Sequence, residues 1–146
     1  MVAAFAQERW GTAKVVSRGK IYWADRLPGL LAMHDDTLVG LVTYTIEDDE
    51  CEIVTLDSTV EGIGIGTALI EAAKEIATSA NCRRLWLITT NDNVDALRFY
   101  QKRGLVLAKL HPLALDHSRT LKPEIPLVGN YGIPLRDELE LEMILQ

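Results

Sequence analysis

Cysteine is scarce in this chain of 146 residues, which contains only Cys51 and Cys82. The two thiols show no CxxC spacing and no neighbouring pair of histidines, so a zinc site is not predicted. Free cysteines of this kind are usually buried, and we expect two buried or half-buried thiols. His34, His111 and His117 also lack the spacing of metal ligands, so surface or structural roles and no metal are expected.

Long hydrophobic runs and a basic excess are also missing. No segment approaches the roughly 18 apolar residues of a membrane span. The apolar start Met1–Trp10 lacks a basic beginning and is soon interrupted by Gln7, Glu8 and Arg9, which is untypical of a signal peptide. We therefore expect a cytoplasmic protein with no membrane partner. The 15 basic and 21 acidic residues give a net charge of -6, which disfavours nucleic acid and suits a cationic acceptor.

The length predicts a single domain covering residues 1–146. The first half reads as strands: Leu30–Met33, Leu38–Ile46 and Cys51–Leu56 are apolar or β-branched runs. Polar turns separate them at Asp35–Thr37 and Glu47–Asp49. Three strands joined by short turns predict an antiparallel meander.

After the meander the hydrophobic period changes. Apolar residues recur every three or four positions in Gly66–Ala80, which predicts a helix. Arg84–Ile88 reads as a central strand, and Val94–Tyr100 as a second helix that Gly104 ends. Leu105–Leu110 reads as a further strand. This alternation predicts an α/β (α+β) fold: a mixed, mainly antiparallel sheet with helices on both faces.

The two ends of the chain are less regular. Ala3–Trp10 has room for one short helix at most, and the tail from Pro112 to Pro134 contains four prolines and reads as irregular. It ends in the strict alternation Leu139–Met143, which predicts a strand with one dry and one wet face.

A glycine-rich turn joins the third strand to the first long helix: Gly62-Ile63-Gly64-Ile65-Gly66-Thr67. Alternate glycines leave the backbone amides exposed, and the following helix contributes the positive end of its dipole. The segment therefore suits binding of a phosphate or pyrophosphate. No lysine follows as a P-loop requires, and the spacing departs from the dinucleotide fingerprint G-x-G-x-x-G. The alternative is a tight turn that packs the helix closely on the sheet.

The second helix contains Asn93-x-x-Ala96-x-x-x-Tyr100-x-x-x-Gly104-Leu105. This segment resembles the fourth helix of GNAT N-acetyltransferases, although the family usually ends it Gly-Phe. The glycine turn is similar to the family's acetyl-CoA stretch, with Glu61 where Arg or Gln is usual. Both motifs stand in the family's order, and the resemblance covers roughly Leu38 to Leu110.

The resemblance implies acetyl-CoA as co-substrate and no metal. Backbone groups of Leu56 and Asp57 would hold the acetyl-pantetheine arm, and Asn93 would bond the pantetheine or a neighbouring strand. Tyr100 would point its hydroxyl at the CoA sulfur and protonate the leaving thiolate; without the motif it would read as a core aromatic. The pyrophosphate would be bound by the amides of Gly62, Ile63, Gly64, Ile65, Gly66 and Thr67.

The implied reaction is direct attack of a neutral amine on the thioester, which needs a base. Glu50 and Glu52 alternate along the third strand and share one face. Glu52 is the preferred base because it is nearer the thioester, the alternative being two solvated carboxylates. Arg18, beside Gly19, is either part of the acceptor site or a surface arginine.

Other functions stay open at this point. The main alternative is a catalytically silent module that binds acetyl-CoA as a sensor or regulator, and Glu61 favours it. A third is an interaction domain that binds no CoA, which the glycine turn disfavours. The acceptor is a small-molecule or peptide amine of unspecified identity, and a homodimer through the terminal strand or the tail is a further expectation.

Overall fold

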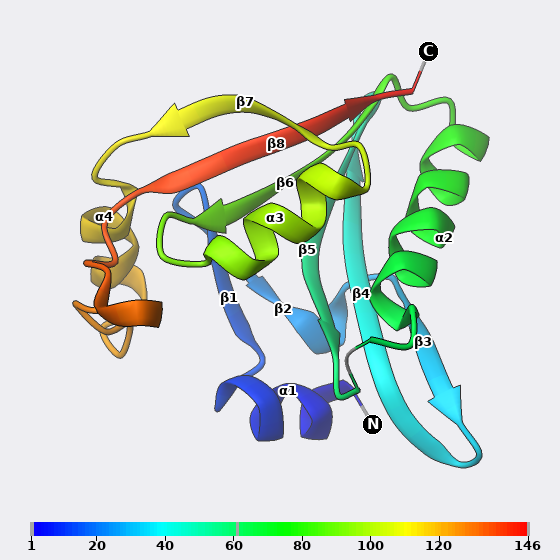
Figure 1. Cartoon of the computed structure of the whole chain (residues 1–146), viewed down its shortest axis with the longest axis horizontal. Helices are drawn as coiled ribbons and strands as arrows, with labels where there is room; N and C mark the ends of the chain where they lie inside the picture. The colour runs from blue at the N-terminus through cyan, green and yellow to red at the C-terminus, as the bar shows by residue number, and fades with distance from the viewer. Residues whose placement is uncertain (1, 61, 146) are drawn as a thin grey trace. The chain divides into compact units, whose positions relative to one another are not determined.

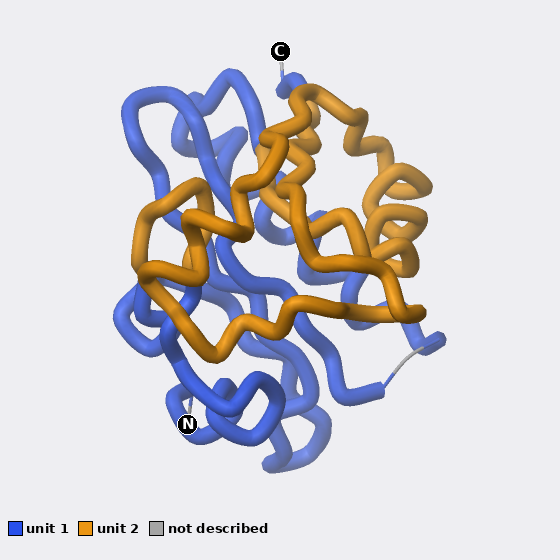
Figure 2. The backbone as a smooth tube through the Cα atoms, turned by 90° about the vertical axis from the view of Figure 1, so that its left-hand side faces the viewer, with its two compact units in different colours: residues 1–15, 22–85, 144–146 blue, residues 16–21, 86–143 orange. Residues whose placement is uncertain are grey.

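The computed structural model describes residues 2–60 and 62–145. Figure 2 shows two compact units. The first comprises residues 1–15, 22–85 and 144–146, and the second comprises residues 16–21 and 86–143. The single domain over residues 1–146 stays a prediction.

The first unit is built around an antiparallel meander of three strands, drawn side by side in Figure 1. The strands are β3 (Gly29–His34), β4 (Thr37–Glu47) and β5 (Glu50–Ser58). Asp35 and Asp48 turn the chain with positive φ values of 55° and 56°, a conformation that aspartate tolerates better than most residues. The predicted meander is confirmed.

Helices cover both faces of this meander. Helix α2 (Ile65–Ser79) packs on all three strands and buries Leu69, Ile70, Ala73 and Ala77. Gly40 of β4 faces α2, whereas its neighbour Leu41 pairs with Asp57 on the opposite face. Asp57 is bonded there by helix α1 (Val2–Trp10). The expected fold class, with helices on both faces of a mainly antiparallel sheet, is confirmed.

A short hairpin follows α1. Strands β1 (Lys14–Ser17) and β2 (Lys20–Trp23) form a two-stranded sheet, and the 3-10 turn η1 (Ala24–Arg26) leads on to β3. Arg18 and Gly19 form its turn with φ values of 50° and 73°. This hairpin is not predicted by the sequence pattern.

The second unit contains three strands in the order β6-β8-β7. They are β6 (Arg84–Thr90), whose first two residues belong to the first unit, β8 (Glu138–Ile144) and β7 (Val106–His111), which pairs antiparallel with β8. Helix α3 (Val94–Lys102) contacts β7, and Gly104 follows it with φ 99°. The tail also contains helix α4 (Ala114–Leu121) and the 3-10 turn η2 (Asn130–Gly132).

Two expectations for the tail are wrong. Residues 114–121 form a helix rather than irregular chain, and this helix begins after Leu113 in the left-handed region (φ 61°) without a side-chain cap. The glutamates of strand β8 do not form a solvated face, because Glu138 is 2% exposed, Glu140 is 5% exposed and Glu142 is half-buried. Alternation separates the two faces of a strand but does not show what covers each one.

Candidate functional site

The glycine turn leads directly into the N-terminus of α2. Gly62 and Gly64 have φ values of 81° and 83°, where a side chain is strained, and Gly64 is the N-cap residue of α2. A Cβ atom at either position would meet no heavy atom of the described residues within 4 Å. These glycines are therefore required by backbone conformation and leave open space, so a turn needed only for close packing explains them poorly.

The electrostatics of this end of α2 suit an anion. The first amides of an α-helix have no intrahelical acceptor, and the helix dipole places partial positive charge there. The described first turn of α2 contains no acidic side chain. Glu61, which stands where the family prefers Arg or Gln, lies outside the described residues. The segment from Gly62 to Thr67 therefore fits a pyrophosphate, and no described carboxylate of that turn opposes it.

Strand β5 contains a bulge where the sequence showed only a regular strand. Thr43 of β4 pairs with Thr55, but the next residue, Tyr44, pairs with Ile53, so Val54 is an extra residue on β5. A bulge interrupts the ladder and re-aims the following side chains. As a result Glu52, Thr55 and Asp57 lie on the face that α1 covers, although strict alternation would separate Glu52 from the other two.

Glu52 and Glu50, the two candidate bases, have different environments. Glu50 forms ion pairs with Arg83, at 3.0 Å, and with Arg84. Glu52 is 5% exposed, and its Oε1 accepts a hydrogen bond from the Tyr22 hydroxyl at 3.2 Å. Glu52 is therefore the better placed of the two for proton transfer, because Glu50 is neutralised by two guanidinium groups.

Asp57 uses its carboxylate to hold α1. Arg9 donates to both carboxylate oxygens at 2.9 Å, and the Trp10 Nε1 donates at 3.0 Å. The Asp57 side chain is thereby engaged, so the predicted contact with the pantetheine arm would fall to backbone groups of Leu56 and Asp57, which pair with Val42 and Leu41 of β4. Arg9, Trp10 and Tyr22 were missed in the sequence because no motif or periodicity links them to β5.

Cys51 lies beside Glu52 and is fully buried, as is Cys82. Burial, together with the smaller effects of the nearby Cys82 and Glu52, raises the pKa of Cys51 from its ordinary value to about 12. A thiol of this kind stays protonated at neutral pH and is no nucleophile. The expected burial of the two cysteines is confirmed.

The remaining predicted site residues belong to the second unit. Asn93 is the N-cap residue of α3, and its side chain makes no capping hydrogen bond. Tyr100 lies two turns further along the same helix, half-buried, with its ring edge-to-face against Phe99 at 5.7 Å. Glu52, Leu56, Asp57 and the glycine turn belong to the first unit.

The start of α3 is tied to the tail of the same unit. The buried Asp92 accepts hydrogen bonds from the Thr90 hydroxyl and, at 2.9 Å, from the Asn130 amide. A Cβ atom on Gly129 would lie 2.1 Å from an oxygen of Asp92, so only glycine fits there. The proline-rich tail is thus fixed beside Asn93.

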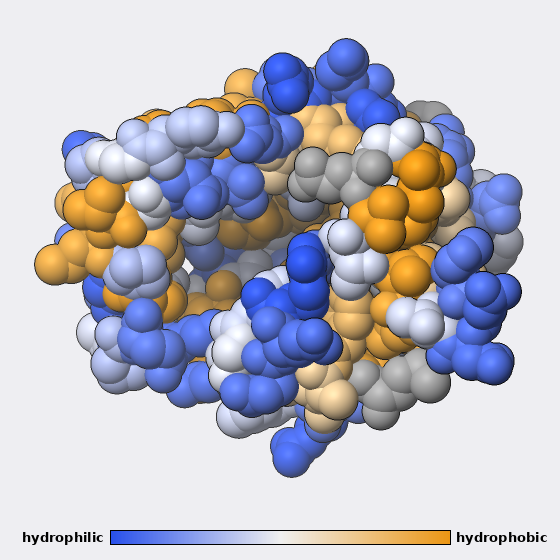
Figure 3. All heavy atoms as spheres, turned by 60° about the horizontal axis from the view of Figure 1, so that its bottom comes forward, coloured by the Kyte–Doolittle hydropathy of each residue, from blue (hydrophilic) through white to orange (hydrophobic). Residues whose placement is uncertain are grey.

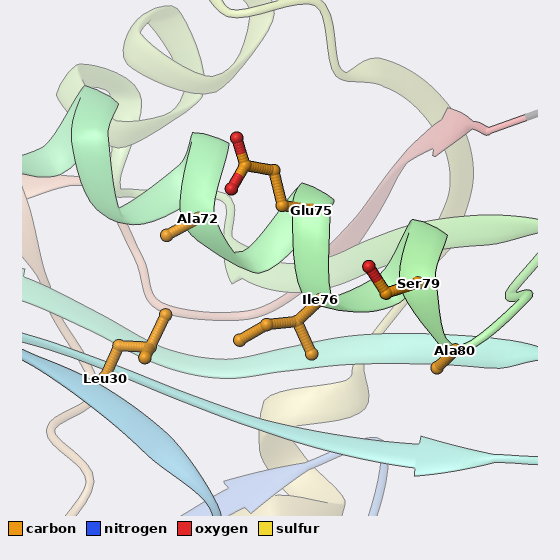
Figure 4. A pocket seen from close by; sticks show the side chains of 6 residues that line it. All are labelled: Leu30, Ala72, Glu75, Ile76, Ser79 and Ala80. Atoms are coloured by element: carbon orange, nitrogen blue, oxygen red, sulfur yellow. The ribbon is translucent and has the colours of Figure 1, made fainter.

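A groove of about 570 Å³ is lined by Leu30 of β3 and by residues of the C-terminal half of α2 (Figure 4). Its walls are mainly aliphatic, and Glu75 is its one ionisable lining residue. Ser79 and Ala80 line it at the C-terminal end of α2, about 20 Å from the glycine turn at 1.5 Å per residue. This groove brings together no set of reactive groups. It is lined by Leu30, Ala72, Glu75, Ile76, Ser79 and Ala80.

Within residues 2–60 and 62–145, no three His, Cys, Asp or Glu side chains are placed to hold a metal ion. Over the same residues, no helix has the length and apolar character needed to cross a membrane.

Comparison with known proteins gives a consistent result. The sequence profile of the acetyltransferase (GNAT) family matches residues 3–105. The uncharacterized protein YxbD of Bacillus subtilis (strain 168) is 49% identical over 147 residues, which cover 100% of this chain and 92% of YxbD.

Solved structures share the fold at lower identity. A Bacillus subtilis acetyltransferase in complex with CoA has a TM-score of 0.71 at 22% identity, covering 84% of this chain and 79% of that one. A GNAT family acetyltransferase from Elizabethkingia anophelis with acetyl-CoA bound has a TM-score of 0.68 at 23% identity, covering 79% and 74%.

Proposed function

The chain belongs to the acetyltransferase (GNAT) family, and from this premise we propose that it transfers an acetyl group from acetyl-CoA to the nitrogen of an amine. One observation carries the proposal. Two positive-φ glycines with open space around them, Gly62 and Gly64, stand directly before the N-terminus of α2. Two proteins of the same fold hold CoA or acetyl-CoA, which supports the choice of ligand.

The bulge in strand β5 supports the proposed position of the thioester beside this strand. The bulge at Val54 interrupts the ladder, which is regular again from Thr55, and Leu56 lies two residues beyond the bulge. In the proposal, a backbone amide near Leu56 donates to the carbonyl oxygen of the thioester as it becomes an oxyanion. The amides of Gly62, Ile63, Gly64, Ile65, Gly66 and Thr67 bind the pyrophosphate.

The proposed chemistry is one acyl transfer with three proton movements. An ammonium acceptor gives a proton to Glu52, directly or through a water, and becomes a neutral amine. Its nitrogen attacks the thioester carbon, so that a C–N bond forms and the C–S bond breaks. The leaving thiolate takes the proton of the Tyr100 hydroxyl, whose ordinary pKa near 10 suits a thiolate of comparable basicity. The second proton that the nitrogen loses as the amide forms then returns the tyrosinate to tyrosine.

Calorimetric titration with acetyl-CoA tests the ligand. We expect wild-type binding in the micromolar range and a loss of about tenfold or more, 1.4 kcal/mol, in Gly64→Asp. The new carboxylate would occupy the helix amides and repel phosphate. Gly11→Asp is the matched control, because Gly11 also has a positive φ (76°) and open space, but follows α1.

Equal binding by wild type and Gly64→Asp, or no binding by wild type, would refute the pyrophosphate site. Release of free CoA thiol with a panel of small-molecule and peptide amines then separates an enzyme from a silent acetyl-CoA module. Binding without thiol release for any amine would favour the module.

A further inference from the structure

The proposed base, Glu52, is poorly accessible to an acceptor. It is 5% exposed, so little of its carboxylate meets solvent. Leu56, beside which the thioester is proposed to lie, follows four residues later on β5, about 10–13 Å away at ~3.3 Å per strand residue with a bulge between them. The Glu52 side chain is too short to span that distance, so a proton from an amine at the thioester reaches it through another group.

A hydroxyl group of the same unit is in contact with Glu52. Tyr22 of β2 donates its hydroxyl to Glu52 Oε1 at 3.2 Å. The side chain of Tyr22 is half-buried, in contrast to the buried carboxylate that it touches. Tyr22 therefore extends from a partly solvated position to the base.

The alternation of β2 turns Tyr22 toward the meander. Its neighbours Ile21 and Trp23 are each 41% exposed, as expected for side chains on the opposite face of a short strand. The chain is fixed directly afterwards, because the amide of the buried Ala24 donates to the carbonyl of Ala13 at 2.8 Å. The position of the Tyr22 ring is thus set by the hairpin and by the segment that leaves it.

The bulge of β5 sets the position of the other partner. Val54 is an extra residue, so Glu52 lies on the face that α1 covers. A regular strand would turn Glu52 to the face of α2 and away from Tyr22. The contact between Tyr22 and Glu52 therefore depends on the same irregularity that precedes the proposed position of the thioester.

We propose that Tyr22 is a proton relay between the acceptor ammonium and Glu52. A hydroxyl has one donor and two acceptor lone pairs, so Tyr22 accepts from an ammonium N–H while it donates to the carboxylate. The ammonium proton moves to Tyr22 Oη as the hydroxyl proton moves to Glu52 Oε1. The products are a neutral amine, a protonated Glu52 and an unchanged tyrosine. The inference rests on the proposed acetyl transfer and deepens it by naming the path of the first proton.

The relay is needed only by an acceptor that arrives protonated, and this separates it from a structural role. Ethylamine is an ammonium ion at pH 7, whereas 2,2,2-trifluoroethylamine, of similar size, is largely neutral because its fluorines withdraw electrons. Tyr22→Phe keeps the ring and removes the hydroxyl. A variant that merely distorts the site would lose activity with both amines.

The test measures kcat/KM of the full-length protein for each amine at pH 7, by release of free CoA thiol at saturating acetyl-CoA. For Tyr22→Phe we expect a loss of about tenfold or more with ethylamine and less than about threefold with trifluoroethylamine, the pattern of a lost proton transfer. Glu52→Gln should show the same pattern. Tyr44→Phe is the matched control, because Tyr44 is a half-buried tyrosine of the meander that pairs with Ile53 rather than Glu52, and it should change neither value.

Equal losses with the two amines in Tyr22→Phe, or no loss with ethylamine, would overturn the relay and keep the acetyltransferase. An ethylamine-specific loss in Glu52→Gln alone would assign the step to a water. No thiol release by wild type with either amine would reject the acetyl transfer and the relay together. Titration with acetyl-CoA should give the same dissociation constant for wild type and Tyr22→Phe, and weaker binding by the variant would mean that Tyr22 supports the site rather than the proton transfer.

Discussion

Two side chains, Glu52 and Tyr100, carry the proton transfers of the proposed reaction. Glu52 is buried and accepts a hydrogen bond from Tyr22, whereas Glu50 on the same face is engaged by Arg83 and Arg84. This difference in partners, rather than position on the strand, distinguishes the two carboxylates. A second tyrosine of the same unit, Tyr131, provides a matched control for removal of the Tyr100 hydroxyl.

Removing the Tyr100 hydroxyl should slow turnover without weakening acetyl-CoA binding. We expect Tyr100→Phe to lower kcat by about 10²-fold, the lower range for loss of a general acid, with an unchanged dissociation constant. Tyr131→Phe removes a hydroxyl that bonds Asp95 at 2.6 Å on the exposed tail and should leave kcat as it is. Equal kcat values for Tyr100→Phe and wild type, measured by thiol release, would assign the leaving-group proton to another source.

Among the elements, the contact between α2 and β4 sets the position of the glycine turn. Gly40 faces Ile65, the first residue of α2, and a Cβ on Gly40 would lie 2.7 Å from Ile65 Cγ2 and 3.1 Å from the Cβ of Ala32. The N-terminus of the helix therefore approaches the sheet as closely as glycine allows. Any displacement here moves the amides proposed to bind pyrophosphate.

Gly40→Ala should lower the free energy of unfolding by about 1–3 kcal/mol, because the added methyl overpacks this contact. Urea denaturation measures the loss, and titration with acetyl-CoA should show weaker binding as α2 shifts. The double variant Gly40→Ala with Ile65→Ala removes the clashing Cγ2 and should be less destabilised than the sum of its single changes. If the losses of the two single variants simply add in the double variant, the methyl group of Gly40→Ala does not clash with Ile65.

The elements differ in how far the sequence predicts them. The β3–β5 meander and helices α2 and α3 are predicted by a strong periodicity of apolar residues and by aspartate or glycine residues that mark the turns and the ends of elements. The β1–β2 hairpin does not, because its strands have four residues each and Arg18-Gly19 lacks the Asn or Asp expected in such a turn. Helix α4 follows Pro112, and its N-cap residue Leu113 makes no side-chain capping hydrogen bond, so the sequence contains no signal for the start of this helix.

The candidate site divides in the same way. The glycine turn and the N-terminus of α3 are local motifs, so their residues are visible in the sequence. The pairs Tyr22–Glu52, Trp10–Asp57 and Arg18–Glu138 join residues 30 or more positions apart, and no local pattern links them. Tertiary contacts also turn the glutamates of β8 from an expected wet face into a buried one.

For the whole molecule, charge affects the two ligands of the proposed reaction in opposite ways. The net charge is -6, and Figure 3 shows hydrophilic and hydrophobic residues interspersed over one face rather than a continuous apolar surface. A negative protein attracts ammonium ions and repels the phosphates of CoA over a Debye length of about 8 Å. In the proposal, binding of acetyl-CoA therefore depends on the local dipole and amides of α2.

The ionisation of Glu138 affects the stability of the protein. Burial raises the pKa of Glu138 above its ordinary 4.5, although the Arg18 amide, His111, the Arg18 charge and His117 all oppose the shift. The folded protein therefore keeps this proton to a higher pH than the unfolded chain. In that interval the folded state binds more protons, so the free energy of unfolding falls as the pH rises from 4.5 through the raised pKa.

Glu138→Gln should therefore stabilise the protein at pH 7. The amide is uncharged and still accepts from Arg18, so we expect the free energy of unfolding to rise by about 1 kcal/mol. Urea denaturation at pH 7 and pH 4 measures this, and the gain should vanish at pH 4, where both states of wild type hold the proton. Glu124→Gln, which changes an exposed carboxylate of the same unit, is the control and should show no gain at either pH. Lower stability of Glu138→Gln at pH 7 would mean that the buried charge supports the fold.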